Sequence, residues 1–389
     1  MILSHKIRIY PNKEQEQFLK KSCGVARFAY NWGLEEWQKQ YKNGGKPDWI
    51  KLNKLFNSIK KQEFPFVCEV SASCSERALV NLGKSYKNFF SRKYKFPRFK
   101  KKGFLDSFYL KNNCFKLNGK YIKLAKMKPM RMAEPLRFDG KIMSGTVSRV
   151  ADKWYISISV EVRRDLTLPK TGKFVGVDLG VKDIAITSDG CKFANPRWIH
   201  KSEKKLKRLN RELSRRHRAS KRRERTRLRL ARQHDRVANQ RKDWLHKITT
   251  YLVRKYDVIA LENLNVRGMV KNHNLAKAIT NVSFGEFNRQ IEYKAQMYGK
   301  QIYRVDRFFP SSKTCSFCGC VQEKMPLHVR EWTCPDCGAH HDRDINAATN
   351  LLRQAMPEVT RGERSALVIS EISDVTKLDS LNRESYKFI

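Results

Sequence analysis

Residues 174–190 read FVGVDLGVKDIAITSDG, and this stretch decides how the fold is interpreted. It predicts an apolar strand, a bend with Gly176 and Gly180, a second strand, and a turn at the final Asp-Gly pair. The first strand ends in Asp178. A carboxylate at the end of an apolar strand is costly unless it is paired or binds a cation. Asp178 is therefore a candidate functional residue.

Two further acids occupy comparable positions. Glu262 ends the apolar run of YDVIALENLNV (256–266), and Asp344 lies in HDRDINAATNLL (341–352), where a helix is expected to begin. Sites in α/β sheets collect at the carboxyl ends of strands, and converging acids suit Mg²⁺. Two Mg²⁺ ions ~3.5–4 Å apart would activate water and stabilise the leaving oxygen of a phosphodiester. The order of strands, helices and acids is that of an RNase H-like nuclease core, with Asp178, Glu262 and Asp344 as catalytic residues and Mg²⁺ ligands.

A structural alternative exists for the acids near the last helix. Asp342 or Asp344 could cap a helix that starts near Ile345, since aspartate there satisfies free amides and favours the helix dipole. Because Asp178 and Glu262 call for a partner, we predict that Asp344 is catalytic. Asp342 is then a cap or a supporting residue.

Four cysteines form the spacing C-x2-C-x15-C-x2-C, which is typical of a closed tetrahedral zinc site. They are Cys315, Cys318, Cys334 and Cys337. A glycine follows each pair, which suits a tight turn whose amides approach the thiolate sulfurs. Four thiolates leave no open position for catalysis, so one structural Zn²⁺ is expected, with iron as the minor alternative. Cys320, His340 and His341 are not expected to bind the metal.

The composition points to a polyanionic partner. The 389 residues include 81 Lys and Arg against 38 Asp and Glu, which gives a formal charge of +43 and a pI of about 10.1. Such a charge is typical of a nucleic-acid-binding protein. No membrane association is expected, because no apolar stretch approaches ~18 residues and the first residues lack a signal-peptide pattern.

The charge is concentrated in residues 201–242, which carry 19 Lys or Arg and four acids, and this segment predicts a long basic helix or helical hairpin. A shorter basic stretch, KFPRFKKKG, covers residues 95–103. Ten residues from the two segments are candidate phosphate contacts: Lys204, Lys205, Arg208, Arg215, Arg216, Arg222, Arg223, Lys95, Arg98 and Lys100. Their contacts are expected to be insensitive to base sequence and to weaken steeply with salt.

The N-terminal half has a different pattern. HKIRIYP (5–11) reads as one strand, residues 12–93 as helices, and residues 104–165 as short alternating runs of a small antiparallel barrel or sandwich that the first strand can join. In the last of these runs Trp154, Ile156, Ile158, Val160 and Val162 share one face. Tyr30, Trp32 and Trp37 could stack on bases, although core packing is the favoured interpretation.

The motifs GVDLG, LENL, FFPSSKTCSFCG, CPDCG and HDRDINAATNLL together resemble those of the TnpB proteins of bacterial insertion sequences. The similarity extends over most of the chain. It implies a small RNA-guided DNA endonuclease related to the CRISPR type V effectors, whose guide is an RNA transcribed from the transposon end. It also implies a double-stranded DNA target beside a short protein-read motif and one RuvC site that cuts both strands. We expect a monomeric ribonucleoprotein in the bacterial cytoplasm, associated with the nucleoid, although the sequence leaves the oligomeric state open.

The resemblance also implies a multidomain α+β organisation. An RNase H-like (RuvC) α/β core with a zinc-ribbon-like insert would follow a small β-barrel interrupted by a helical bundle. The expected parts are the first strand of the wedge barrel (1–11), a helical recognition domain (12–95), the rest of the barrel (96–170), the RuvC core (171–310), the target-nucleic-acid-binding zinc insert (311–340), the last RuvC helix (341–353) and a flexible tail (354–389).

Two other function classes fit part of the pattern. An unguided RNase H-like enzyme, such as a junction-resolving nuclease, would share the acids but has no use for ~170 residues of basic helices and barrel before them. A non-enzymatic zinc-containing nucleic-acid binder would share the charge, and DNA cleavage by the purified protein would exclude it.

Overall fold

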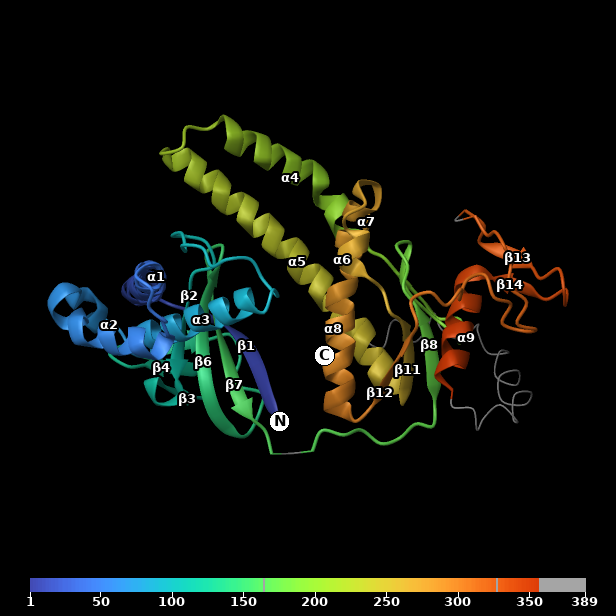
Figure 1. Ribbon diagram of the computed structural model, residues 1–389, viewed down its shortest axis with the longest axis horizontal. Helices are drawn as coiled ribbons and strands as arrows, with labels where there is room; N and C mark the ends of the chain where they lie inside the picture. Colours follow the sequence, from blue (N-terminus) through green and yellow to red (C-terminus); the bar gives the residue numbers. More distant parts are fainter. Residues whose placement is uncertain (164, 327, 357–389) are drawn as a thin grey trace. The chain divides into compact units, whose positions relative to one another are not determined.

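The computed structural model describes residues 1–163, 165–326 and 328–356. The chain forms two compact units, which Figure 1 shows in sequence colours. The N-terminal unit comprises Met1–Arg164 with Leu209–Asp235, and the C-terminal unit comprises Asp165–Arg208 with the chain from Arg236 onward.

The N-terminal unit contains a seven-stranded antiparallel sheet in the order β2-β6-β7-β1-β5-β4-β3. Its strands are β1 (Ile2–Tyr10), β2 (Ser107–Lys111), β3 (Phe115–Asn118), β4 (Tyr121–Leu124), β5 (Met130–Met132), β6 (Lys141–Val150) and β7 (Lys153–Glu161). The first strand joins the later ones, as predicted, and pairs with both β7 and β5. The edge strands β2 and β3 are separated in the chain only by the short 3-10 helix η2 (Asn112–Cys114), so the sheet curls.

Helices pack beside this sheet and build its core. They are α1 (Lys13–Lys42), α2 (Trp49–Glu63), the 3-10 helix η1 (Pro65–Glu69) and α3 (Ser73–Phe90). Asn12 and Gln15 form a reciprocal capping box that starts α1 directly after β1. Tyr30 and Trp37 are buried, and Trp37 stacks on Tyr86 at 4.2 Å between ring centroids. The predicted apolar face of β7 is also buried, from Trp154 to Val162.

The C-terminal unit contains a five-stranded sheet in the order β10-β9-β8-β11-β12. Its strands are β8 (Phe174–Asp178), β9 (Asp183–Thr187), β10 (Lys192–Ala194), β11 (Val258–Glu262) and β12 (Gln301–Val305). β8, β11 and β12 are parallel neighbours, whereas β9 and β10 are antiparallel. The helices and the remaining strands are α6 (Val266–Met269), α7 (His273–Val282), α8 (Phe284–Tyr298), β13 (Glu331–Thr333), β14 (His340–Asp342) and α9 (Arg343–Ala355).

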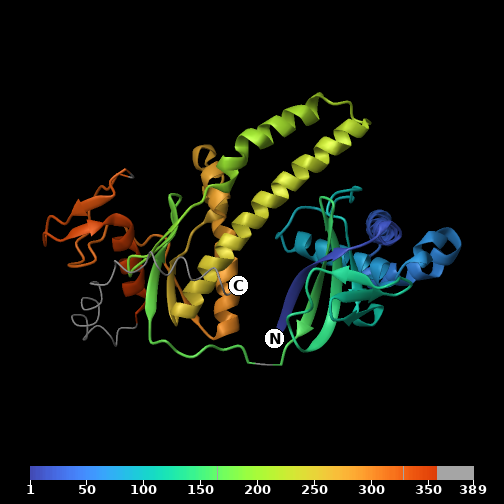
Figure 2. The ribbon, with the colours of Figure 1, turned by 180° about the vertical axis from the view of Figure 1, so that it is seen from behind.

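Helices cover both faces of this sheet, as the two views in Figures 1 and 2 show. Val175, Val177 and Leu261 pack into one core with α8 and the last part of helix α5 (Lys221–Lys255). Ala260 of β11 packs on the opposite face with Leu351 of α9. Successive residues of a strand point to opposite faces of the sheet. The strand residues that alternate with Val175, Val177 and Leu261 therefore face α9.

Gly176 lies in the middle of β8, so the bend that we predicted there is wrong. A Cβ atom at this position would lie 1.8 Å from the carbonyl oxygen of Ala348 in α9. The glycine therefore permits the helix backbone to approach the strand rather than turning the chain.

The basic segment forms a hairpin of two helices, α4 (Trp198–Arg215) and α5 (Lys221–Lys255). The sequence placed it whole within the C-terminal part, but Leu209–Asp235 belongs to the N-terminal unit. Ion pairs explain the difference: Arg232 binds Asp152 through two bonds of 3.0 and 2.8 Å, and Lys153 lies 3.1 Å from Asp235.

Two further expectations concern membrane spans and the C-terminal tail. Within the described ranges, no helix is long and apolar enough to cross a membrane. The tail expected at 354–389 overlaps α9 up to Ala355, and from residue 357 it lies outside the described residues.

The close packing at Gly176 gives the first prediction. Gly176→Ala should lower the free energy of unfolding by roughly 2 kcal/mol or more, because a backbone carbonyl cannot move aside as a flexible side chain can. Urea unfolding followed by circular dichroism measures this change. Gly285→Ala in α8 is the matched control, since its Cβ meets nothing within 4 Å. It should raise stability by up to about 1 kcal/mol, and equal effects of the two variants would contradict the packing argument.

Candidate functional site

The carboxylates of Asp178 and Glu262 lie on the same face of the C-terminal sheet. Val177 pairs with Leu261 in the parallel register of β8 and β11, so the next residues, Asp178 and Glu262, end adjacent strands at one edge. Val177 and Leu261 face the core with α8. Alternation therefore directs Asp178 and Glu262 toward the face that α9 covers.

The negative charges of Glu262 and Asp344 act on the carboxyl group of Asp178. The pKa of Asp178 is raised from 3.8 to about 7, first by burial and then by the negative charges of Glu262 and Asp344. The charge of Arg343 opposes this shift but does not cancel it. Burial also raises the pKa of Glu262. Glu262 and Asp344, which are far from Asp178 in the sequence, thus contribute to an environment that disfavours the ionised form of Asp178.

The start of α9 separates the roles of its two aspartates. Asp342 is the N-cap, and its Oδ1 accepts hydrogen bonds of 3.0 Å from the amides of Asp344 and Ile345. Its other oxygen lies 2.6 Å from Lys192 Nζ. Asp344 lies in the first turn, with an ion pair of 3.3 Å to Arg330, and its charge acts on Asp178. The cap expected at Asp342 is thus observed.

Two asparagines of α9 were missed by the sequence reasoning. Asn346 and Asn350 are both buried, and their Nδ2 groups donate to the carbonyl of Thr314 at 2.7 and 2.6 Å. Asn346 Oδ1 accepts from the amide of Ser316 at 2.8 Å, and Asn350 also donates to Ser311 at 2.8 Å. The i, i+4 spacing of two polar residues in NAATN was the available signal. These bonds hold the first cysteine turn on the helix that carries Asp344.

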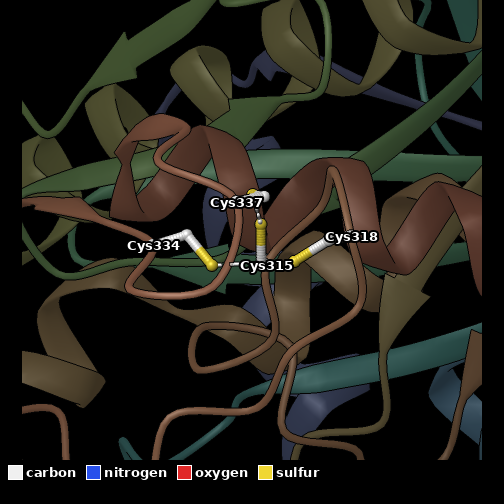
Figure 3. Close-up of side chains that lie close together, drawn as sticks. All are labelled: Cys315, Cys318, Cys334 and Cys337. Carbon is white, nitrogen blue, oxygen red and sulfur yellow. Dashed lines mark hydrogen bonds between the residues drawn. The ribbon is translucent and has the colours of Figure 1, made fainter.

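The four predicted cysteines come together, as Figure 3 shows. Their sulfur atoms all lie within 4.8 Å of one another. The separations are 3.7 Å for Cys315 and Cys337 and 3.6 Å for Cys318 and Cys334. In a tetrahedron with metal–sulfur bonds of about 2.3 Å, the sulfurs would be roughly 3.8 Å apart. The thiols are free and are placed almost as a tetrahedral metal ion would require.

Local turns hold these sulfurs. Gly319 and Gly338 adopt left-handed backbone angles, with φ of 86° and 72°, directly after the two cysteine pairs. The amide of Phe317 donates to Cys315 Sγ at 3.4 Å. His341 Nε2 lies 3.0 Å from the same sulfur, where its ring can support the thiolate by a hydrogen bond.

The acids are spaced more widely than the cysteines. Among the described residues, the cysteines form the one group of three or more metal-ligating side chains whose ligand atoms lie within 4.8 Å of one another. The carboxylates of Asp178, Glu262 and Asp344 repel one another, and such oxygen ligands suit a hard cation between them. The cysteine group suits a soft or borderline ion, so the two sites favour different metals.

Most candidate phosphate contacts are accessible. Two of the ten, Arg216 and Arg223, are half-buried. The other eight are exposed: Lys204, Lys205, Arg208, Arg215, Arg222, Lys95, Arg98 and Lys100. Arg216 donates to the carbonyl of Arg222 at 2.6 Å and so closes the helical hairpin. Lys100 directs its ammonium group over the Tyr30 ring, 4.0 Å from the centroid, and shielding of that group from water lowers its pKa.

Three family models match the chain. Residues 157–273 match a family described as "Probable transposase", and residues 284–351 match a "Cas12f1-like, TNB domain". Residues 1–46 match a "Helix-turn-helix domain". In the structure this last stretch is β1 followed by the single 30-residue helix α1.

Full-length relatives agree with these matches. A protein of Streptomyces pristinaespiralis named "Putative RNA-guided DNA endonuclease" is 36% identical over 365 residues, which is 92% of this chain and 90% of that protein. A protein of Escherichia coli (strain K12) named "Putative RNA-guided DNA endonuclease InsQ" is 29% identical over 92% of this chain and 93% of its own.

A solved structure shares the fold. It is titled "Cryo-EM structure of the Cas12f1-sgRNA-target DNA complex", with a TM-score of 0.57 and 13% identity over 90% of this chain and 98% of that chain. The sequence relative that is 36% identical covers nearly the whole of both chains. The chain therefore belongs to the TnpB family, as its sequence motifs indicated.

Proposed function

We propose that this protein is an RNA-guided DNA endonuclease whose RuvC-type site is formed by Asp178, Glu262 and Asp344. The observation that carries the proposal is the joint electrostatic environment of these acids at the carboxyl ends of β8 and β11 and the start of α9. Such an arrangement supports hydrolysis of a phosphodiester assisted by two Mg²⁺ ions. The names of the full-length relatives support the guided DNA substrate.

The chain's own residues prepare this site for cations. Asp178 must lose its proton to act as a ligand, and its raised pKa means that this loss competes with binding. Asp342 does not compete for a cation, because the amides of α9 and Lys192 engage its two oxygens. When bound, Mg²⁺ would supply the activated water and the stabilisation of the leaving oxygen.

The four cysteines hold one structural Zn²⁺ in this proposal, and we assign residues 311–340 to a target-nucleic-acid-binding insert. The sulfur separations of 3.6 and 3.7 Å support the tetrahedral ion. A closed set of four thiolates binds but does not catalyse. The bonds from Asn346 and Asn350 make the insert and α9 one connected structure.

Nucleic acid is the partner that the charge requires. The formal charge of +43 and the exposed basic residues of α4 and α5 support phosphate contacts. Within this proposal the guide is an RNA from the transposon end, and the curled sheet and helices of the N-terminal unit form the wedge and recognition parts. The target is double-stranded DNA beside a short motif that the protein reads.

The first prediction from this proposal concerns cleavage. Asp178→Asn should reduce cutting of a guided duplex target at least about a hundredfold, because loss of one metal ligand removes roughly 3 kcal/mol of transition-state stabilisation. RNA that co-purifies with the protein, expressed with its native flanking DNA, is sequenced to define the guide for the assay.

The control for this experiment is Asp243→Asn, an exposed acid of α5 that pairs with Lys247. It should cut like the parent protein, and both variants should retain the RNA. If Asp178→Asn cut within tenfold of the parent, the catalytic assignment would be wrong.

A second prediction concerns pH. Without Mg²⁺, the native state keeps the Asp178 proton up to about pH 7, whereas the unfolded chain releases it near 3.8. The unfolded state therefore binds fewer protons between these values, and stability falls as the pH rises through this window. Asp178→Asn removes this loss, so its advantage in Tm over the parent should be larger at pH 8 than at pH 4.

Added Mg²⁺ should reduce this Tm advantage at pH 8, because only the parent protein has the Asp178 carboxylate with which to bind the ion. Thermal unfolding of both proteins at each pH, with and without Mg²⁺, gives the comparison. A Tm difference that does not vary with pH would show that Asp178 is not buried among like charges.

A third prediction concerns zinc. Cys334→Ser should reduce bound zinc from one ion per chain to well below one and lower the Tm, because a structural ion contributes directly to folding. Cys320→Ser is the matched control. Its backbone carbonyl accepts from the Cys315 amide, but its sulfur is not part of the group of four. Metal analysis of both purified variants tests this, and equal zinc loss would refute the choice of ligands.

A further inference from the structure

The end of α3 and the loop that joins it to β2 expose many large apolar side chains. Residues 90–105 include six that are at least 45% exposed: Phe90, Tyr94, Phe96, Phe99, Phe104 and Leu105. The same stretch carries seven Lys or Arg and no acid. Exposed apolar residues that occur singly need no explanation, but a cluster of them among cations indicates a binding surface.

Phe104 and Leu105 stand out within this loop. Their exposed fractions are 73% and 82%, and they are adjacent in the chain. Leu105 has a φ of 52°, in the left-handed region that leucine rarely adopts. Strained backbone persists where the surrounding structure holds it, and it is found preferentially at functional sites.

Hydrogen bonds hold both sides of this pair. Asp106 accepts from the Gly103 amide at 3.2 Å, pairs with Arg27 at 3.4 Å, and its carbonyl accepts from the Arg149 amide at 2.9 Å. The Phe104 amide donates to the Lys101 carbonyl at 3.3 Å. The two apolar side chains are thus presented on a supported turn.

The preceding residues are also anchored. The backbone of Lys100 exchanges two hydrogen bonds with the side chain of Asn31 in α1, at 2.8 and 3.0 Å. The ammonium group of Lys100 lies over Tyr30. Lys101 and Lys102 are exposed beside the apolar pair. The turn therefore places two exposed cations next to two exposed apolar side chains.

We propose that Phe104 and Leu105 insert between base pairs of the target duplex and start its separation, while Lys101 and Lys102 bind the flanking phosphates. This inference rests on the proposed function, because a guide can pair with duplex DNA only after the strands open. Apolar side chains that enter a base step unstack it, and neighbouring cations offset the charge of the backbone. Duplex DNA is favoured over unpaired RNA because unstacking is useful only where bases are still stacked and paired.

The test compares two DNA targets for the same guide. One is fully paired, and the other has mismatches between its own strands in the first few base pairs beside the protein-read motif. The double variant Phe104→Ala/Leu105→Ala should cut the paired target at least about tenfold more slowly than the parent. It should cut the mismatched target within about twofold of the parent, because that duplex is already open.

Two further variants make the test specific. Tyr303→Ala removes an exposed ring outside this loop, 45% exposed in β12, and should cut both targets normally. Phe104→Trp keeps a large flat side chain and should retain most activity on the paired target. Duplex opening can also be followed without cutting, in protein that carries Asp178→Asn. A fluorescent adenine analogue placed beside the motif should report opening of the duplex when Phe104 and Leu105 are present. The signal should be lost when both are replaced by alanine.

Several results would overturn the proposal. Equal loss on both targets, normal cutting of the paired target, or reduced retention of the guide RNA by a folded double variant would each do so, the last by indicating an RNA contact. If the parent protein cut neither target, the proposed function itself would fail, which is a different result from any of these.

Discussion

The close approach of α9 to β8 is the contact on which the site depends. Gly176 lacks a side chain where the carbonyl of Ala348 would otherwise meet a Cβ atom at 1.8 Å. Asp178 is two residues farther along the strand and points to the same face, and Asp344 is four residues, about one turn, before Ala348. The distance between helix and strand therefore determines whether the carboxylates of Asp178 and Asp344 can act on one ion.

The same helix also holds the cysteine cluster, and in the sequence the four cysteines directly precede the helix that carries Asp344. One face of α9 meets β8 through Ala348, while Asn346 and Asn350 bind the loop that leads to Cys315. A short helix that is held on both of these faces has little freedom to shift. The cysteine cluster thus contributes to the position of Asp344.

The sequence predicted the parts of this site that depend on local pattern. Strand alternation, the acid at each strand end and the cysteine spacing are all local, and the structure has the corresponding strands and the sulfur cluster. The contacts of Gly176 and Asn346 could not be predicted, because their partners lie far away in the chain. For the same reason, the ion pair of Arg232 with Asp152, which ties part of α5 to the N-terminal unit, had no local signal.

The many lysines and arginines of the chain do not neutralise the carboxylate of Asp178. Arg330 pairs with Asp344, and Lys192 pairs with Asp342, so the two aspartates at the start of α9 have basic partners. At Asp178, however, burial and two like charges outweigh the influence of Arg343 and raise the pKa to about 7. Carboxylate oxygens that repel one another are suitable ligands for a small divalent cation. Asp178 is therefore the group whose ionisation a divalent cation would favour most.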